Sequence, residues 1–557
     1  MLKERVDLKR ARRRQTFNLN GSFVSLGCFN RIVSDYEQVR LDVSTGTASR
    51  MASSVAAVEN AVEQGEVIYG VTTGFGGMAN EQISCEQATA LQGNLLNFLA
   101  AGAGPELDPR HVRGAMALRA NVLLQGCSGI RLEIVERLIK FLNAGATPVV
   151  REYGSIGASG DLVPLACIAR AITGQNDFSR IRIDGELRTS QEVLNQFKLS
   201  PIELQAKEGL ALVNGTSFSA AIAANAACEA RNLLAISFSV QSMLMRSLLV
   251  DTGPFDAFVH RCKPHPGQIW SATTIRELLT NQCESKVAET DTVQDRYSLR
   301  CFPQYTGPIV EGIARVQSVV EREMNAVSDN PLIDPATGQF HQSGNFLGQY
   351  VGIAMDDLRR FIGLLAKHID VQIATVVSPQ FNGGLSASLR GNDDKPYNMG
   401  LKGLQICGNS IMPMLTYQAN PIVEHFPTHA EQFNQNINGL SWGAANLAWK
   451  SVQMYQQYLA IGLITAVQAV DLRAKQVLGH YDGRQLLGKS NQRIYSTVCS
   501  LLDAKPNQDQ PFLFDDSDRW LEQDIEKLAN DLGSQGSLIK DASPILKSFD
   551  TFCEEQA

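Results

Sequence analysis

Long stretches without proline dominate the second part of the chain. In the stretch 208–251, apolar residues recur at three- and four-residue spacing between Leu233 and Leu244, as in a helix with one buried face. The stretches 344–372 and 428–505 have the same character, and the second must break at its glycines because it is too long for one globular helix. Helices of about forty residues, about 60 Å long, bury their apolar faces best against one another. The pattern therefore predicts a mainly α protein built on a bundle of long helices, in which more than one chain takes part.

The first part of the chain has a different pattern. It contains more glycine, short β-branched runs such as 67–71, and a strand-like alternation over 181–187. This predicts a smaller, mixed and loop-rich N-terminal region. Neither an internal repeat nor a low-complexity linker separates the two regions. We expect one continuous structure with a basic flexible arm at 1–15, the mixed region at 16–205 and an elongated helical region at 206–557.

Composition and charge narrow the class of protein. A chain of 557 residues with 44% hydrophobic content can bury a large core. The net charge of −7 offers no broad basic field, which argues against a nucleic-acid partner. The basic arm at 1–15 is an exception that we interpret as a solvated tail, with binding of an acidic partner as the alternative. No apolar segment follows the arm, so we expect no secretory signal.

The most apolar segment and the cysteines indicate the cellular compartment of the protein. The segment 458–470 is shorter than the roughly 20 residues that span a bilayer, and Thr465 and Gln468 interrupt it, so it predicts a buried core helix rather than a membrane span. The 11 cysteines are odd in number and scattered, without a C-x-x-C pair. This distribution favours free thiols in the cytoplasm over a disulfide framework or a zinc site.

The sharpest local signal is GSIGASGDLVPLA at 154–166. Its glycine content alone is typical of an ordinary loop. In a tightly bent loop, however, the amide nitrogen of Gly160 can attack the carbonyl carbon of Ala158, because glycine has no side chain to obstruct the approach. Loss of water from Ser159 then leaves an exocyclic methylidene. The product would be a strong electrophile, made without a metal or an added cofactor.

This segment resembles the signature of the ammonia lyases and aminomutases whose prosthetic group is 4-methylideneimidazole-5-one (MIO). The likeness extends over nearly the whole chain, through YGVTTGFGG at 69–77, KEGLALVNGTS at 207–217, QDRYSLRCFPQY at 294–305, DNPLID at 329–334, GNFLGQY at 344–350, GLKGLQICGNS at 400–410 and HAEQFNQN at 429–436. It is strongest to the bacterial, cyanobacterial-type phenylalanine ammonia lyases. The resemblance implies an ammonia-lyase-like fold, an MIO formed from Ala158, Ser159 and Gly160, and homotetramers in which several chains contribute to each active site.

The resemblance also implies roles for single residues. The substrate's amine adds to the methylidene carbon derived from Ser159, while Tyr69 removes the β-proton as tyrosinate. Arg300 anchors the substrate's carboxylate with its planar guanidinium, and Asn330 completes that site. Further polar and aromatic residues are assigned to the surroundings of the MIO and the amine: Asn214, Gln294, Tyr297, Phe346, Glu431, Asn434 and Gln435.

Each of these residues has an ordinary alternative, because spacing alone fits core packing, surface ion pairs and solvated amides equally well. The glycines at 74–79 also fit a dinucleotide-binding pattern, but a βαβ frame is missing. His425, His429 and Glu431 lie close enough in sequence for a metal site, but Pro427 breaks the helix that would bring the histidines together. We therefore expect no metal and no nucleotide.

By the same resemblance, the segment 95–102 determines which aromatic ring the enzyme accepts. Lyases for tyrosine or histidine carry a histidine in this segment. Here Phe98 and Leu99 occupy that position. Further positions of the apolar wall are Leu95, Leu162, Leu210 and Ile406. A tyrosine hydroxyl against Phe98 would lose water without gaining a partner, at a cost of about 1–3 kcal/mol. Lys402 near the pocket mouth is a candidate partner that would soften this preference.

The predicted reaction is therefore conversion of L-phenylalanine to trans-cinnamate and ammonia, with tyrosine as a poor substrate. An MIO-dependent phenylalanine aminomutase is the nearest alternative, because it uses the same group and returns ammonia at the β-carbon. A catalytically inactive helical scaffold is the alternative from a different class. The intact set of Ala158, Ser159, Gly160, Tyr69 and Arg300 argues against that scaffold.

Overall fold

The computed structural model describes residues 16–34, 37–175, 178–280, 293–504 and 508–556. The basic arm predicted at 1–15 lies outside these residues. Helices dominate the described chain, and the strands in it are short. The mainly α fold predicted from the hydrophobic pattern is therefore confirmed.

Packing divides the chain into two compact units. Unit 1 consists of Met1–Asn225, Val319–Met355 and Ile422–Asn446, and unit 2 consists of Ala226–Ser318, Asp356–Pro421 and Leu447–Ala557. Each unit is thus assembled from three stretches that are distant in sequence. The division at 1–15, 16–205 and 206–557 stays a prediction.

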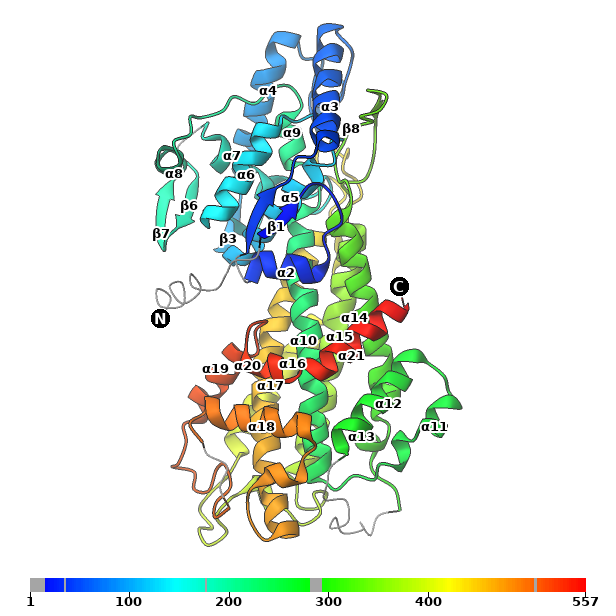
Figure 1. Cartoon of the computed structure of the whole chain (residues 1–557), viewed down its shortest axis with the longest axis vertical. Coiled ribbons are helices and arrows are strands. Elements are labelled where there is room, and N and C mark those ends of the chain that lie inside the picture. The colour runs from blue at the N-terminus through cyan, green and yellow to red at the C-terminus, as the bar shows by residue number, and fades with distance from the viewer. Residues whose placement is uncertain (1–15, 35–36, 176–177, 281–292, 505–507, 557) are drawn as a thin grey trace. The chain divides into compact units, whose positions relative to one another are not determined.

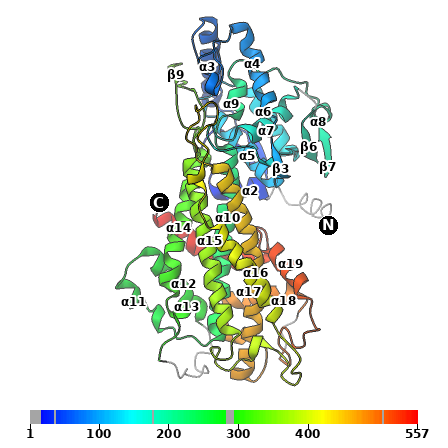
Figure 2. The same cartoon turned by 180° about the vertical axis from the view of Figure 1, so that it is seen from behind.

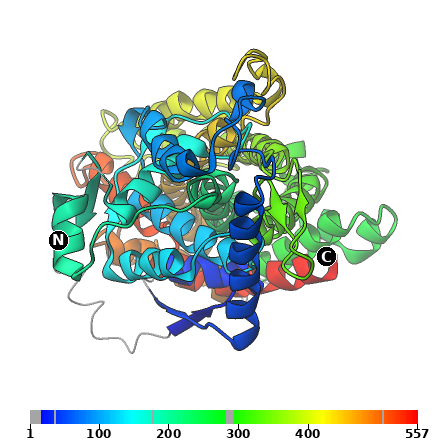
Figure 3. The ribbon, with the colours of Figure 1, turned by 90° about the horizontal axis from the view of Figure 1, so that it is seen from above.

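Unit 1 combines short helices with small sheets. Seen from above, its blue and cyan helices run in several directions (Figure 3). These helices are α2 (Leu26–Ser34), α3 (Thr45–Glu63), η1 (Gly76–Met78), α4 (Cys85–Phe98), α5 (Pro109–Leu123), α6 (Leu132–Ala144), α7 (Leu162–Thr173), α8 (Ser190–Phe197), α9 (Glu208–Val213) and η5 (Val423–His425). The loop-rich character predicted for this part of the chain is seen in the structure.

The strands of unit 1 pair locally. Their bounds are β1 (Thr16–Leu19), β2 (Gln38–Leu41), β3 (Ala103–Glu106), β4 (Thr147–Pro148), β5 (Arg151–Tyr153), β6 (Arg180–Ile183), β7 (Glu186–Thr189), β8 (Leu332–Ile333) and β9 (Phe340–His341). β1 pairs with β2 in parallel, and the pairs β3–β5, β4–β6, β6–β7 and β8–β9 are antiparallel. The β6–β7 hairpin, with Ile183 opposite Glu186, confirms the strand-like pattern at 181–187.

The β-branched run at 67–71 forms a turn rather than a strand. The hydroxyl of Thr72 accepts from the amide of Ile68 at 2.8 Å and donates to the carbonyl of Glu66 at 2.6 Å. Gly70 follows with φ +67°, a conformation that a β-branched residue avoids. Local hydrogen bonds and one glycine therefore override the strand propensity of this run.

The stretch 208–251 is helical, as predicted, but it is interrupted. α9 ends at Val213 and α10 (Ser217–Ser247) begins four residues later. Gly215 lies in the gap with φ +139°, and a Cβ there would lie 2.3 Å from the carbonyl oxygen of Ser328. Only glycine fits this position. The sequence Asn-Gly-Thr therefore bends the backbone at the point where the helical pattern alone predicts continuity.

Unit 2 contains most of the long helices, which run alongside one another (Figure 1 and Figure 2). They are α10, α14 (Phe302–Asn325), α15 (Gln349–Val376), α16 (Lys402–Gln418) and α17 (Ser441–Leu478). The other helices of the unit are η2 (Gly253–Phe255), α11 (Ala257–Arg261), α12 (Pro266–Leu279), α13 (Tyr297–Arg300), η4 (Ala387–Leu389), η6 (Gly483–Leu486), α18 (Lys489–Leu501), α19 (Leu521–Asp531), α20 (Ser537–Asp541) and α21 (Ser543–Gln556).

The core of unit 2 is centred on α17. This helix has 38 residues, close to the length of about forty expected for the longest helices. Its segment 458–470 is buried along its whole length and confirms the predicted core helix. Gly462 lies inside the helix, whereas Gly479, with φ +82°, follows its end. Among the described helices, none is long and apolar enough to cross a membrane.

Candidate active site

The loop 158–160 joins β5 to α7 and makes a tight backbone contact with the α9–α10 gap. Gly160 has φ +70°, and a Cβ there would lie 2.1 Å from the carbonyl oxygen of Gly215. The amide of Gly215 donates to the carbonyl of Ser159 at 3.3 Å, and the amide of Asp161 donates to the carbonyl of Gly215 at 2.8 Å. The third position of the loop must therefore be glycine, because two backbones meet there.

Asp161 fastens this loop to the start of α10. Its carboxylate is buried and accepts from the backbone amides of Phe218 and Ser219 at 3.1 and 2.7 Å. Burial raises the pKa of Asp161 to about 6, although these hydrogen bonds act in the opposite direction. The hydroxyl of Ser155 donates to the carbonyl of Gly160 at 3.1 Å. Polar contacts on both sides therefore hold the bend.

Amide side chains approach Ser159 and its neighbours. The Nε2 of Gln435 donates to the Oγ of Ser159 at 2.8 Å. Asn214 caps the end of α9 directly before Gly215, and its Oδ1 is buried without a hydrogen-bond partner among the described residues. An unpaired buried acceptor is costly, so it indicates a place for a donor that the protein chain alone does not supply. Both amides are among the residues predicted from the sequence.

Tyr69 lies in the turn that follows α3. Its hydroxyl accepts from the backbone amide of Gly76 at 3.0 Å. Burial raises the pKa of Tyr69, the Gly76 amide lowers it, and the negative charge of Glu431 raises it further. The side chain of Gln92 holds the turn by donating to the carbonyl of Gly70 at 3.0 Å. The phenol therefore has a fixed position and one backbone donor that favours its ionised form.

The glycines after Tyr69 pack against a second turn. A Cβ on Gly76 would lie 2.4 Å from the Oε2 of Glu431. Residues 431–433 all have positive φ, between 50° and 66°, although none is glycine. Such a run is strained and persists only when the surroundings enforce it. Since Gln435 in the same turn reaches Ser159, this turn brings Glu431, Tyr69 and Ser159 into one cluster. Asn434 belongs to the turn as well, with an exposed side chain.

Asn330 and Phe346 lie on segments tied to the same part of unit 1. Asn330 is 8% exposed, and its Oδ1 accepts from the amide of Ser343 at 2.7 Å. Phe346 is partly buried. Two residues later, the amide of Gly348 donates to the carbonyl of Gly157 at 3.3 Å, which anchors this segment on the loop that carries Ser159.

The predicted ring wall lies on α4, α7 and α9. Leu95, Leu99 and Leu210 are buried, at 2%, 5% and 3% exposure, and Leu162 is half-buried. Leu210 also packs against the Tyr69 turn, because a Cβ on Gly70 would touch its Cδ2 at 2.8 Å. Phe98, the last residue of α4, is 51% exposed. The three buried leucines are therefore fixed parts of unit 1, whereas Phe98 presents its ring at the surface of this chain.

The remaining predicted residues belong to unit 2. Tyr297 is exposed on the short helix α13, and the guanidinium of Arg300 stacks over its ring at 4.6 Å. The Nε of Arg300 is buried without a partner among the described residues. Gln294 is exposed just before α13. Lys402 and Ile406 occupy the first turns of α16, and both are exposed.

Sequence reasoning missed several residues that hold the cluster in place. Asp161, Gln92 and Gly215 support the loop and the Tyr69 turn through the contacts above. Asp161 had only a weak signal, its place directly after the Ala-Ser-Gly tripeptide. Its carboxylate does not cap its own helix α7 and instead accepts from the first amides of α10, which are distant in sequence. The role of Gln92 had no local signal, because its partners lie far away in sequence.

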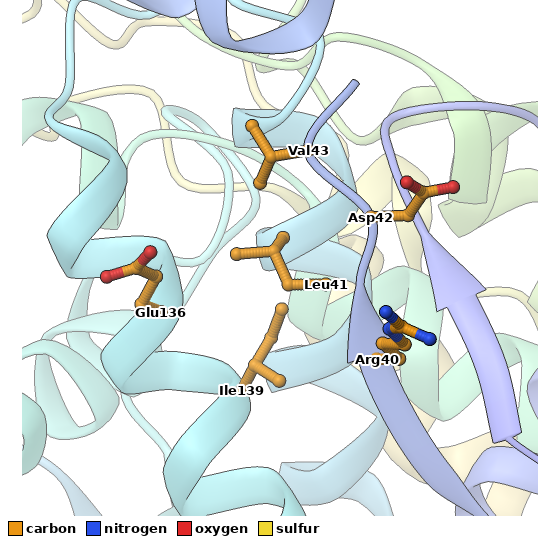
Figure 4. Close-up of a pocket in the computed structure, with 6 residues that line it drawn as sticks. All are labelled: Arg40, Leu41, Asp42, Val43, Glu136 and Ile139. Atoms are coloured by element: carbon orange, nitrogen blue, oxygen red, sulfur yellow. The ribbon is translucent and has the colours of Figure 1, made fainter. Parts of the chain in front are cut away.

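A separate hollow of unit 1 has no link to these residues. It measures about 540 Å³ and lies between the end of β2 and α6, where Glu136 and Ile139 face the segment 40–43 (Figure 4). None of the predicted site residues lines it. The candidate site is therefore defined by the polar cluster around Ser159 rather than by this hollow.

Comparisons with known proteins agree with the geometry. The family model described as aromatic amino acid lyase matches residues 25–498. The chain is 45% identical to the phenylalanine ammonia-lyase of Nostoc punctiforme, over 95% of this chain and 96% of the relative. Among solved structures, it is similar to histidine ammonia-lyase from Trypanosoma cruzi, with a TM-score of 0.83 and 27% identity over 97% of this chain and 98% of that one. Pantoea agglomerans phenylalanine aminomutase gives a TM-score of 0.83 at 29% identity, covering 93% and 99% of the two chains.

Proposed function

Because this chain belongs to the aromatic amino acid lyase family, we propose that it is a phenylalanine ammonia lyase that converts L-phenylalanine to trans-cinnamate and ammonia. The observation that carries the proposal is the tightly bent Ala158-Ser159-Gly160 loop, with the Tyr69 turn and Glu431 clustered around it. The 45% identity to the Nostoc enzyme and the apolar residues at 95–99 support phenylalanine as the substrate.

The prosthetic group of the family, the MIO, fits the residues present. Gly160 leaves its amide nitrogen unobstructed by a side chain, and a side chain at this position would meet the carbonyl oxygen of Gly215. Gln435 contacts the Ser159 hydroxyl that would be lost. The unpartnered Oδ1 of Asn214, in the segment that pairs with the loop, is an acceptor and suits the ammonium group of the substrate rather than the MIO itself, which carries no N–H donor. When formed, the MIO supplies the electrophile that turns the substrate's amine into a leaving group.

Tyr69 is the proposed base for the β-proton. An ordinary tyrosine has a pKa near 10, and burial together with Glu431 raises the pKa of Tyr69. The amide of Gly76 counters this by donating to the phenolic oxygen. We expect the bound substrate's ammonium group and further donors to favour the phenolate during reaction. Glu431, in contact with the same turn, is the proposed group that places or accepts a proton of the amine.

Asn330 and Arg300 are each proposed to bind the substrate's carboxylate, and the shared active sites of the proposed tetramer allow the two residues to come from different chains. The backbone amide of Ser343 donates to the Oδ1 of Asn330, so the Nδ2 of Asn330 is the atom that would donate to a carboxylate. Arg300 contributes a planar, always charged guanidinium, which forms two parallel bonds to a carboxylate. The assignments of Gln294, Tyr297, Phe346, Lys402, Ile406 and Asn434 follow the family likeness and are part of the same proposal.

The proposal includes a homotetramer in the cytoplasm with active sites shared between chains. Large apolar side chains on α16, such as Ile406, Met414 and Tyr417, are 63%, 51% and 73% exposed in the single chain, which supports burial by a second copy. Sedimentation analysis of the purified protein tests this part, since a stable monomer would contradict it.

A phenylalanine aminomutase is the second candidate, supported by the similarity to the Pantoea aminomutase structure. The two reactions differ in whether cinnamate leaves or takes ammonia back at the β-carbon. Product analysis with phenylalanine, tyrosine and histidine in parallel separates them. Free cinnamate as the main product from phenylalanine supports the lyase, and β-phenylalanine as the main product would replace it by the aminomutase.

Intact-mass measurement tests the electrophile separately. Formation of the MIO would remove two waters, about 36 Da, from the wild-type chain: one carries away the carbonyl oxygen of Ala158 on ring closure, and the other carries away the hydroxyl of Ser159. We expect Ser159→Ala to lack this loss, to fold normally and to have no turnover. Wild-type turnover in that variant would contradict the mechanism, and an unshifted wild-type mass would support the inactive scaffold.

A further inference from the structure

A completely buried ion pair includes Asp329, the residue directly before Asn330. The Nζ of Lys207 is 2.8 Å from the Oδ2 of Asp329, and both side chains are 0% exposed. Removing two charges from water is costly, and their attraction repays that cost only with good geometry and additional hydrogen bonds. Apolar residues of similar volume would often serve stability equally well. The pair therefore calls for an explanation beyond stability.

The acidic partner orients the residue that follows it. The second oxygen of Asp329, Oδ1, accepts from the backbone amide of Asn330 at 2.7 Å. The hydroxyl of Ser343 donates to the carbonyl of Asp329 at 2.8 Å, while the amide of Ser343 donates to the Oδ1 of Asn330 at 2.7 Å. The Asp329 carboxylate and Ser343 together determine both the backbone and the amide orientation of Asn330.

The basic partner joins this segment to α9. Lys207 directly precedes α9 with φ +74°, and Asn214 directly follows the end of α9. A second buried cation, Arg119, reinforces the link, because it donates to the carbonyl of Ser328 at 3.1 Å and also to that of Ala211. Burial lowers the pKa of Lys207, while the carboxylate of Asp329 raises it. The charged side chains of Lys207 and Arg119 therefore link the segment before Asn214 to the segment before Asn330.

We propose that Lys207 and Asp329 are positioning residues for the substrate's carboxylate, which hold the Asn330 amide in its donating orientation. This inference rests on the proposed function of Asn330. Neither Lys207 nor Asp329 touches the substrate, because both are fully enclosed. The pair acts through Asn330, so its loss should weaken the recognition of a carboxylate more than the recognition of the ring.

The test compares two inhibitors that share a ring and differ at one end: trans-cinnamate, which has a carboxylate, and cinnamyl alcohol, which lacks it. In Asp329→Asn, we expect the inhibition constant for cinnamate to rise about tenfold, as for one lost hydrogen bond to a charged group. The constant for cinnamyl alcohol should change less than about twofold. KM for phenylalanine should rise more than kcat falls, and the mass loss of the mature loop should persist.

The double variant Lys207→Met/Asp329→Asn limits the risk of misfolding, because it removes both charges of the ion pair together, while the buried Arg119 keeps the charge of Asp161 and its carbonyl partners. It should show the same selective loss of cinnamate affinity, at least about threefold. Glu208→Gln is the control, since the buried Glu208 forms a neighbouring ion pair at 2.7 Å with the partly exposed Arg131, through contacts that do not involve Asn330. It should not discriminate between the two inhibitors.

Equal weakening of both inhibitors, or wild-type cinnamate affinity in the double variant, would overturn the positioning role. Failure of the proposed function is a distinct result, because wild-type protein would then release no cinnamate from phenylalanine. The wild-type arm therefore separates the two hypotheses.

Discussion

The loop that carries Ser159 in unit 1 and the helix α17 at the core of unit 2 are held by opposite means. Around Ser159 the backbone leaves regular structure, with Gly160 and Gly215 in direct contact and three successive residues at 431–433 with positive φ. Along 458–470 the backbone is regular and almost every side chain is buried. The irregular region depends on hydrogen bonds and glycines, and the regular one depends on apolar packing.

This difference teaches where substitutions should affect chemistry and where they should affect stability. A small change at the irregular loop should abolish activity in a protein that still folds. A similar change in the helical core should reduce the free energy of unfolding while the folded molecules keep their activity.

The largest effect is expected for Gly160→Ala. The added methyl would lie 2.1 Å from the carbonyl oxygen of Gly215, and the alanine would have to adopt a backbone φ of +70°. The loop cannot then close, so kcat/KM should fall by at least about 1000-fold, as in enzymes that lose a catalytic group. Activity assays, intact mass and circular dichroism on the purified variant measure this effect.

Gly408→Ala is the matched control on the helical side. Gly408 lies inside α16, and a Cβ there would meet Tyr458 and Ile461 at 3.4 and 3.6 Å, which is ordinary contact. Alanine favours a helix over glycine by about 1 kcal/mol, so stability should rise slightly. If Gly160→Ala kept its activity while Gly408→Ala lost it, activity would depend on the helical region rather than on the irregular loop.

Next in size is Leu463→Ala in α17, where the leucine is 0% exposed. The free energy of unfolding should fall by about 2–5 kcal/mol because the substitution leaves a cavity. Urea unfolding followed by circular dichroism measures this, with Leu463→Met as a volume-conserving control. Activity per folded molecule should change little, and a tenfold loss at unchanged stability would show that the core of unit 2 serves the chemistry directly.

Phe98→His should have a smaller and more selective effect. A histidine can pair with the hydroxyl of tyrosine, which Phe98 cannot do, so the ratio of kcat/KM for tyrosine to that for phenylalanine should rise about 10- to 100-fold. Phe98→Leu is the control, since it removes the ring without adding a polar group. An equal gain in both variants would mean that space, rather than hydrogen bonding, selects the substrate.

The smallest effect concerns pH. The proposed base, Tyr69, would have to be deprotonated to act, and the negative charge of Glu431 raises its pKa. Glu431→Gln removes that charge, so the pKa of Tyr69 should fall and the alkaline rise in kcat should move to lower pH. A pH profile of kcat measures this shift even if the absolute rate falls. The profile should lack this limb in Tyr69→Phe, and a shift to higher pH in Glu431→Gln would contradict the assigned base.

The sequence predicted the regular elements better than the irregular ones. The helix around 458–470 and the hairpin at 181–187 follow from periodicity, because burial of one face or of all faces repeats with a fixed spacing. The interruption between α9 and α10 was not predicted. Its cause is the approach of Gly215 to Ser159 and Ser328, which are distant in sequence, and periodicity contains no information about such contacts.

The residues of the candidate site also differ in how well the sequence predicts them. Ala158, Ser159 and Gly160 were identified from local chemistry, since a tripeptide that cyclises needs a glycine at its third position. Tyr69 and Glu431 were assigned only through the family likeness, and the structure places them beside the same turn. The buried pair of Lys207 and Asp329 could not be inferred, because an isolated Lys and an isolated Asp are usually solvated.

The contact between Gly160 and Gly215 limits how this protein can be modified. A methyl on Gly160 would meet the carbonyl of Gly215, and a methyl on Gly215 would meet the carbonyl of Ser328 at 2.3 Å. Three separate stretches of backbone are thus locked together with no room for a single added carbon. Laboratory evolution toward new substrates should therefore accumulate changes in the side chains of α4 and α16, while these three stretches accept none.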